Sequence, residues 1–260
     1  TFPIGIFDSG IGGTSIWKQM NTLLPYENTI YLSDSKNAPY GEKSKQTIID
    51  LAIKNTEILL NRNCKIIIVA CNTATTNAID ILREKYSIPF IGIEPAIKPA
   101  ALKTRTNIIG ILATKGTLNS KLFEQTSSTI NEKIIRKEII GKGLVALIES
   151  GKLDSKEMTA LLSSYIIPLI KENVDCLVLG CTHYPYLIPQ IRKIVGNKIQ
   201  IIDSGEAVAR QTKTVLHKNN LINTSKDKSE HKFYINKDKK ILELIIQDCK
   251  TNIEIEEEDF

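Results

Sequence analysis

Short apolar runs alternate along the chain with longer stretches of helical spacing. Apolar runs bounded by turn formers indicate buried strands, and apolar positions three and four residues apart indicate amphipathic helices. The first part of the chain predicts strands at 4–7, 29–33, 65–70 and 89–93, and helices at 14–24, 47–60 and 73–86. Strands that alternate with helices are typical of a parallel sheet covered by helices.

The same order of elements then begins again. The pattern predicts strands at 108–112, 134–139, 176–180 and 199–202, and helices at 120–127, 144–150, 155–171 and 189–194. Residues 6–10 of the first pass correspond to residues 111–115 of the second. We therefore expect an α/β fold of two similar parallel-sheet domains related by pseudo-twofold symmetry, with the active site in the cleft between them.

A final segment has no counterpart in this duplicated scheme. It predicts a helix at 206–217, a polar loop at 219–232, and a strand, helix and strand at 232–235, 239–248 and 252–256. We expect this segment to pack back on the first half. The predicted domains are therefore residues 1–95 plus 206–260, and residues 96–205.

The composition is that of a soluble globular protein, with 42% hydrophobic and 24% charged residues. Apolar runs are too short for a membrane span, and the first residues lead into a strand without a signal-peptide pattern. Neither membrane insertion nor secretion is therefore expected. The net charge is +5, but the lysines are dispersed among acidic residues, so we expect no nucleic-acid partner.

Five cysteines in a chain of 260 residues favour free thiols in a reducing compartment, the cytoplasm. Two of them share a local context, because each ends an aliphatic run, follows a small residue and precedes polar groups. These contexts are Val69-Ala70-Cys71-Asn72-Thr73 and Leu179-Gly180-Cys181-Thr182-His183. Since they stand at equivalent places in the two passes, we expect both thiols to face a common cleft.

Two thiols on opposite sides of one substrate suit the inversion of a carbon centre. One thiolate removes a proton while the other thiol delivers one to the opposite face. Cys71 and Cys181 each precede a predicted helix, whose N-terminus favours the thiolate. The alternative is that the cysteines are small buried hydrophobes, as we expect for Cys64, Cys176 and Cys249. A Cys-His hydrolase that uses Cys181 is also possible, but it leaves Cys71 unexplained.

The loop Asp8-Ser9-Gly10-Ile11-Gly12-Gly13 is similar to a glycine-rich phosphate loop. Ser15 occupies the third glycine position, however, and Asp8 stands where a pyrophosphate has to approach. We therefore expect the loop to present backbone N–H groups to a small ligand, with Asp8 meeting an ammonium group. The three histidines lack the spacing of a metal site, so no metal is expected.

Four motifs together resemble the glutamate racemases of the cofactor-independent aspartate/glutamate racemase family. They are residues 7–13, Asp34 with Pro39-Tyr40-Gly41, residues 69–74 and residues 179–185. The resemblance implies a cofactor-independent isomerase that interconverts L- and D-glutamate and supplies D-glutamate for peptidoglycan. It also implies a cytoplasmic homodimer. A racemase or isomerase of another small acid such as aspartate, and a glutamate-binding regulatory protein without turnover, stay open as alternatives.

The resemblance also implies roles for individual residues. Cys71 is expected to take the proton from D-glutamate and Cys181 the proton from L-glutamate. Substrate contacts are implied for Asp8, Ser9, Tyr40, Gly41, Asn72, Thr73, Thr182 and His183. Supporting roles are implied for Asp34, Thr114, Thr117 and Glu149. The chain departs from the family at Ala113, where glycine is usual, and at 141–146, which lacks the usual Cys-Pro and Val-Pro features.

Overall fold

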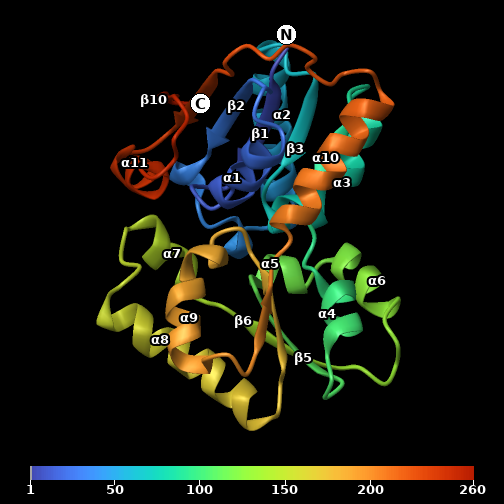
Figure 1. Cartoon of the computed structure of the whole chain (residues 1–260), viewed down its shortest axis with the longest axis vertical. Coiled ribbons are helices and arrows are strands. Elements are labelled where there is room, and N and C mark those ends of the chain that lie inside the picture. The colour runs from blue at the N-terminus through green and yellow to red at the C-terminus, as the bar shows by residue number, and fades with distance from the viewer. Residues whose placement is uncertain (1) are drawn as a thin grey trace.

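The chain folds into two α/β units, seen one above the other in the computed structural model, which describes residues 2–260 (Figure 1). The strands are β1 (Ile4–Asp8), β2 (Thr29–Ser33), β3 (Ile66–Val69), β4 (Phe90–Gly92), β5 (Ile108–Ala113), β6 (Ile135–Ile140), β7 (Cys176–Gly180), β8 (Gln200–Ile202), β9 (His231–Ile235) and β10 (Ile253–Glu257). The α-helices are α1 (Thr14–Leu23), α2 (Lys45–Asn61), α3 (Asn72–Lys85), α4 (Ile97–Lys103), α5 (Lys115–Leu118), α6 (Lys121–Ser128), α7 (Leu144–Glu149), α8 (Lys156–Lys171), α9 (Ile188–Val195), α10 (Gly205–Lys218) and α11 (Lys240–Ile246).

Two parallel sheets confirm the expected fold class. The first has the strand order β10-β9-β2-β1-β3-β4, and the second has the order β6-β5-β7-β8. The order β2-β1-β3-β4 is therefore repeated as β6-β5-β7-β8, which makes β1 equivalent to β5 and β3 equivalent to β7. Cys71 and Cys181 follow the equivalent strands β3 and β7. Strands β9 and β10 extend the first sheet beyond β2.

The central strands are buried on both faces, since every residue of β1, β3 and β7 is buried, whereas the edge strands β6 and β10 are partly exposed. In β1, Ile4 and Ile6 pack with Trp17 of α1, whereas Phe7 packs with residues of α2 and α3 on the opposite face. The strands are rich in β-branched residues because a sheet covered on both sides has no solvent-facing side. Each fully buried side chain of this size contributes roughly 1.5–3 kcal/mol to stability. The core shared by α1 and α10 continues into α7, α8 and α9 of the second unit.

Several short elements were not expected from the hydrophobic pattern. They are α4, α5 and the 3₁₀ helices η1 (Ser35–Asn37), η2 (Tyr40–Glu42) and η3 (Tyr184–Leu187). Such elements are too short to repeat an apolar face, so periodicity does not reveal them. Three of them, η1, η2 and η3, lie just beyond the carboxyl ends of β2 and β7, beside the residues of the site.

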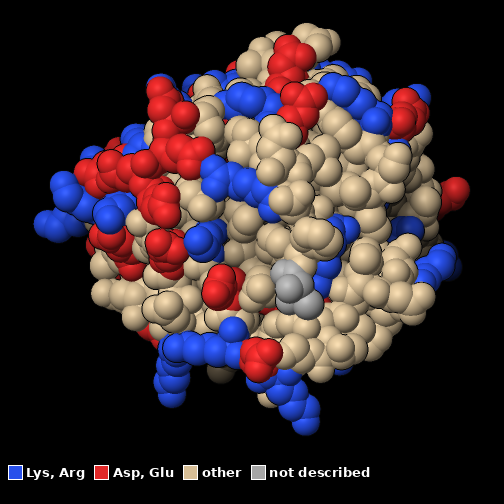
Figure 2. Space-filling view, turned by 90° about the horizontal axis from the view of Figure 1, so that it is seen from above, with Lys and Arg blue, Asp and Glu red and all other residues tan. Residues whose placement is uncertain are grey.

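Charged residues of both signs are interspersed on the face seen in Figure 2, with acidic residues gathered on one side. The final strand contributes to the acidic character of the chain, since residues 254 and 256–259 are all glutamate or aspartate. Among the helices of residues 2–260, none is long and apolar enough to cross a membrane.

Candidate active site

The carboxyl ends of the central strands of the two sheets meet at the boundary between the units. Parallel register places the end of β1 beside the end of β3, and the end of β5 beside that of β7. Hydrogen bonds cross the boundary between the Oγ1 atoms of Thr73 and Thr114 at 2.8 Å, and from Ser15 Oγ to the Thr182 carbonyl oxygen at 2.8 Å. Loops at these strand ends are where ligands of open α/β sheets bind.

Both candidate thiols line one small cavity at this boundary. Its lining residues are Ser9, Pro39, Tyr40, Gly41, Cys71, Asn72, Thr73, Thr114, Val145, Cys181, Thr182 and His183. The cavity measures about 10 Å³, which is room for about one water molecule. A larger cavity of about 450 Å³ adjoins it and shares Pro39, Gly41, Thr114 and Val145. A ligand larger than water therefore needs these walls to move apart.

Cys71 caps the N-terminus of α3, as the sequence predicts. Its Sγ accepts a hydrogen bond from the Ala74 N–H at 3.4 Å and lies 3.6 Å from Ser9 Oγ, to which the thiol donates. The expectation that the helix end lowers the thiol pKa is not met in this closed state. Burial raises the pKa of Cys71, and the nearby Asp8 carboxylate raises it further, against smaller opposing effects from the hydrogen bonds to Ala74 and Ser9.

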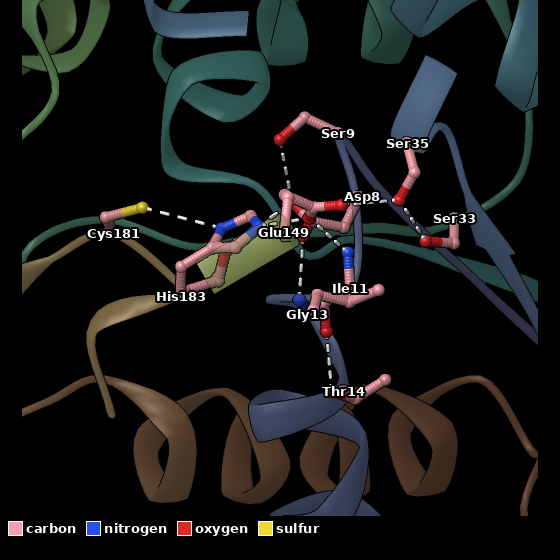
Figure 3. Close-up of polar contacts among 12 residues, drawn as sticks. Asp8, Ser9, Ile11, Gly13, Thr14, Ser33, Ser35, Glu149, Cys181 and His183 are labelled. Carbon is pink, nitrogen blue, oxygen red and sulfur yellow. Dashed lines mark hydrogen bonds and ion pairs between the residues drawn. The ribbon is translucent and has the colours of Figure 1, made fainter. Parts of the chain in front are cut away.

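Cys181 has a different support (Figure 3). Its Sγ lies 3.7 Å from His183 Nδ1, and His183 Nε2 lies 2.6 Å from Glu149 Oε1. Burial lowers the pKa of His183, but the hydrogen bonds and negative charges of Cys181 and Glu149 outweigh burial and raise it well above its usual value. The expected helix does not begin directly after Cys181, because η3 starts only at Tyr184. An imidazolium therefore takes the place of a helix N-terminus.

Glu149 joins the second unit to the first. Besides His183, it accepts hydrogen bonds from the Ile11 N–H at 2.7 Å and from Ser35 Oγ at 2.8 Å. Burial raises the pKa of Glu149, but the hydrogen bond and charge of His183 and the bonds from Ile11 and Ser35 lower it overall. The carboxylate is thus kept ionised beside the imidazole.

The glycine-rich loop binds carboxylates of the protein itself. The Gly13 N–H donates to Asp8 Oδ2 at 2.7 Å, and the Ile11 N–H is taken by Glu149. The expectation that these N–H groups face a ligand is therefore wrong for two of them, and a phosphate at this place would meet two carboxylates. Glycine is required at 12, where a Cβ would lie 2.3 Å from His183 Nδ1.

The remaining predicted residues gather around the same cavity. The Oγ1 atoms of Thr73, Thr114 and Thr117 form a cluster with separations of 2.8–3.3 Å. Thr182 Oγ1 donates to Asp8 Oδ1 at 3.4 Å. The buried Asn72 Oδ1 has no hydrogen-bond partner within the described residues, so it is a free acceptor for a ligand N–H.

Asp8 is buried among these groups. Burial raises its pKa from 3.8 to about 6, against the lowering effects of the His183 charge and the Gly13 N–H. Asp34 lies outside the cavity lining, and the Tyr40 hydroxyl donates to Asp34 Oδ2. Asp34 therefore holds the Tyr40 side chain in place from the side away from the cavity.

Sequence reasoning missed Ser35 and Val145, which complete the site. Ser35 directly follows Asp34 at the carboxyl end of β2, and that position is a signal that could have identified it. Val145 lines both cavities from α7 and is one of many apolar residues in that segment, so the sequence holds no signal for it.

Paired thiols at equivalent strand ends of a duplicated parallel fold suit one class of enzyme, the isomerases that invert a carbon centre. The profile of the Asp/Glu/Hydantoin racemase family matches residues 4–212, and the chain belongs to this family.

Relatives that align over most of the chain are glutamate racemases. The chain is 42% identical over 247 residues to the glutamate racemase of Clostridium perfringens, covering 93% of this chain and 94% of the relative. The solved Escherichia coli glutamate racemase, in complex with L-glutamate and the activator UDP-MurNAc-ala, has a TM-score of 0.87 at 30% identity, covering 99% of this chain and 98% of the other. The Francisella tularensis glutamate racemase in complex with D-glutamate has a TM-score of 0.84 at 31% identity, covering 99% and 97%.

Proposed function

We propose that this protein is a glutamate racemase, which interconverts L- and D-glutamate with Cys71 and Cys181 as its two bases and supplies D-glutamate for peptidoglycan. The observation that carries this proposal is the position of the thiols, which line one small cavity from two different units. A mirror-image product requires a proton to leave one face of the α-carbon and another to arrive on the opposite face, and two thiols that reach one cavity from two different units suit this requirement.

With L-glutamate, the Cys181 thiolate takes the α-proton, which breaks the C–H bond and forms an S–H bond. The electron pair left on carbon is delocalised into the α-carboxylate, and the Cys71 thiol then donates its proton to the opposite face. D-glutamate forms, and the thiolate is now at Cys71. The reaction from D-glutamate runs through the same steps in reverse.

The other residues of the cavity hold the substrate for this transfer. The hydroxyl groups of Thr73, Thr114 and Thr117 are placed to donate to a carboxylate, whose negative charge grows when the proton leaves. Asp8 and the free Asn72 Oδ1 suit the α-ammonium group, because both accept hydrogen bonds. Since the closed cavity holds about one water, substrate binding requires the two units to separate at Gly41 and Thr114.

The proposal includes the cytoplasm as the place of action and a homodimer as the assembly. Free thiols that act as bases require a reducing compartment, and the free cysteines of the chain fit one. Sedimentation of the purified protein tests the assembly, and a mass of a single chain at micromolar concentration would exclude the homodimer.

Single substitutions of the thiols test the function. Circular dichroism should record racemisation of L- and D-glutamate by the wild type, with both aspartates as comparison substrates. Cys71→Ser and Cys181→Ser should each lower racemisation at least about a thousandfold, because serine is a far weaker base at neutral pH. Cys64→Ser is the matched control, since Cys64 is buried away from the cavity. Normal turnover in either active-site variant would exclude the two-base mechanism.

Deuterium from heavy water should enter the α-carbon during inversion. Binding of glutamate without exchange of the α-proton would instead favour a regulatory protein without turnover. Faster inversion of aspartate than of glutamate would favour the aspartate racemase.

A further inference from the structure

The Asp34 carboxylate is the centre of a buried hydrogen-bond network behind the active site. It is fully buried, and its Oδ1 accepts from Asn236 Nδ2 at 2.6 Å and from Asn37 Nδ2 at 2.8 Å. Its Oδ2 accepts from the Tyr40 hydroxyl and from Asn55 Nδ2 at 3.4 Å. Several donors on both oxygens fix the orientation of a buried carboxylate, which would otherwise be costly to bury.

Asn236 comes from the part of the chain that has no counterpart in the second unit. It directly follows β9, and its own side chain is held in place by the protein. Its Oδ1 accepts from the Lys36 N–H at 2.9 Å, and its backbone N–H donates to the Ser33 carbonyl oxygen at 3.3 Å. These contacts leave the Asn236 amide only one orientation, in which Nδ2 donates to Asp34 and, at 3.3 Å, to the Phe260 carbonyl oxygen.

The network ends at the wall of the active-site cavity. Tyr40 and Gly41 lie on η2 and line the cavity. A Cβ on Gly41 would lie 2.6 Å from the Thr114 Cβ, so this part of η2 packs tightly on the second unit. Burial and the charge of Asp34 raise the pKa of Tyr40 well above its usual value, so its hydroxyl keeps its proton and donates to Asp34.

We propose that Asn236 is a positioning residue for substrate binding, which acts through Asp34 and Tyr40 to set the position of the η2 wall. This inference rests on the proposed function, because it concerns the binding of glutamate at that site. The final strand-helix-strand segment would then contribute to the binding site as well as extending the first sheet. Asn236 does not touch the cavity, so it acts on substrate affinity and not on the proton transfers.

Substitution of Asn236 separates this role from a purely structural one. In Asn236→Ala, the KM for both enantiomers should rise about tenfold, the loss expected when a buried hydrogen bond to a charged group is removed. The kcat should change less than about twofold, since the thiols are untouched. Asn223→Ala is the matched control, because Asn223 bonds the Tyr26 carbonyl oxygen from the loop before β9. Its KM should equal that of the wild type, even if its melting temperature falls.

An exchange of the two side chains tests whether Asn236 acts through Asp34. Asn236→Asp keeps the size of the side chain but places two carboxylates together, so its KM should be at least as high as that of Asn236→Ala. The double variant Asp34→Asn with Asn236→Asp restores a donor and an acceptor between the two positions but takes away the acceptor of the Asn37 amide. Its KM should therefore fall below that of Asn236→Asp without reaching the wild-type value. Asn236→Asp also provides a near-isosteric test if the alanine variant does not fold.

The outcomes distinguish this inference from the function on which it rests. A wild type that does not racemise glutamate contradicts the proposed function. A wild type that does, together with an unchanged KM in both Asn236 variants, overturns the role of Asn236 alone. A double variant with a KM as high as that of Asn236→Asp also overturns action through Asp34.

Discussion

The two thiols reach the same cavity with different supports. Cys71 donates to Ser9 Oγ at 3.6 Å, and Ser9 Oγ donates to Asp8 Oδ1 at 3.5 Å. On the other side, Cys181 lies 3.7 Å from His183, which lies 2.6 Å from Glu149. Each thiol therefore contacts one polar side chain, which in turn contacts a carboxylate. The two polar side chains differ, because an imidazole can carry a positive charge at neutral pH and a serine hydroxyl cannot. The duplicated fold repeats the position of the thiol at a strand end, but within the described residues only the Cys181 side has a positively charged neighbour.

This difference gives each thiol its own electrostatic environment. Burial raises the pKa of Cys71, so its thiol keeps its proton at neutral pH. On the other side, the imidazolium of His183 places a positive charge 3.7 Å from the Cys181 sulfur. If the proposed mechanism starts from a thiolate at Cys181 and a thiol at Cys71, the protein takes a proton from L-glutamate with Cys181 and gives one from Cys71. After each turnover to D-glutamate, proton exchange has to restore this state.

The asymmetry cannot appear in the ratio of the two catalytic efficiencies. L- and D-glutamate are mirror images of equal free energy, so kcat/KM must be the same in both directions for every variant. A slower proton transfer at one thiol instead changes the isotope effect measured with α-deuterated substrate. If the transfer at Cys181 becomes limiting, this isotope effect grows for L-glutamate and shrinks for D-glutamate.

The largest effect is expected from His183→Asn. Removal of the imidazole takes away the positive charge beside the proposed base Cys181, and kcat/KM should fall about a thousandfold in both directions, in the range of a lost acid/base group. The isotope effect with α-deuterated L-glutamate should rise, and that with D-glutamate should fall towards one. Stopped-flow or circular dichroism assays with labelled substrates measure both.

His217→Asn is the matched control, since His217 lies in the last turn of α10 outside the cavity. It should leave both isotope effects unchanged. Equal isotope effects for the two enantiomers in His183→Asn would show that the two thiols are equivalent in spite of their supports.

Sequence alone predicted the strands and the placement of both cysteines at one cavity, because these depend on local pattern. Apolar runs mark β1 and β3, and the matched motifs mark Cys71 and Cys181. The contacts between the supports could not be predicted, because Ile11 and Glu149 are brought together only by the packing of the two units. Glycine in the loop is equally compatible with N–H groups that bind a ligand and with N–H groups that bind a carboxylate.

The second-largest effect is expected on the stability of the fold, from substitution of Asp8 on the Cys71 side. Asp8→Asn should stabilise the fold by about 3 kcal/mol at pH 8. This is the free energy equivalent to the difference between the folded pKa of about 6 and the ordinary pKa of 3.8. Between these pH values the unfolded carboxyl loses its proton while the folded one keeps it, so the stability of the wild type falls as pH rises. The gain should vanish at pH 4. The amide that replaces the carboxylate can still accept from Gly13 and donate to hydroxyl groups.

Urea unfolding at pH 8 and pH 4 measures this gain. Asp50→Asn is the control, because Asp50 is exposed on α2 and its substitution should change stability by less than about 0.5 kcal/mol at either pH. A destabilised Asp8→Asn at pH 8 would mean that the charge of Asp8 supports the fold, contrary to the direction of its pKa. The racemase activity should fall in the same variant, since Asp8 is the proposed partner of the substrate ammonium group.

Glu149→Gln should act on the Cys181 side with a smaller effect than His183→Asn. The imidazole stays, but it loses the negative charge that favours its protonated form, so kcat/KM should fall about tenfold in both directions. The isotope effects should shift in the same sense as in His183→Asn. Glu157→Gln, at an exposed position of α8, should change neither quantity. A shift of the isotope effects in the opposite sense would assign Glu149 to the Cys71 side.

Ser9→Ala should have the smallest effect on kcat/KM, but it gives the most direct test of the difference between the supports of Cys71 and Cys181. Only a weak hydrogen bond from the Cys71 thiol is lost, so kcat/KM should fall about threefold. Because the affected transfer is now the one at Cys71, the isotope effect should rise for α-deuterated D-glutamate and fall for L-glutamate. This direction is opposite to that of His183→Asn, so a change in substrate binding alone cannot produce it. Isotope effects that move in the same direction in both variants would show that the two supports serve one shared transfer and not one thiol each.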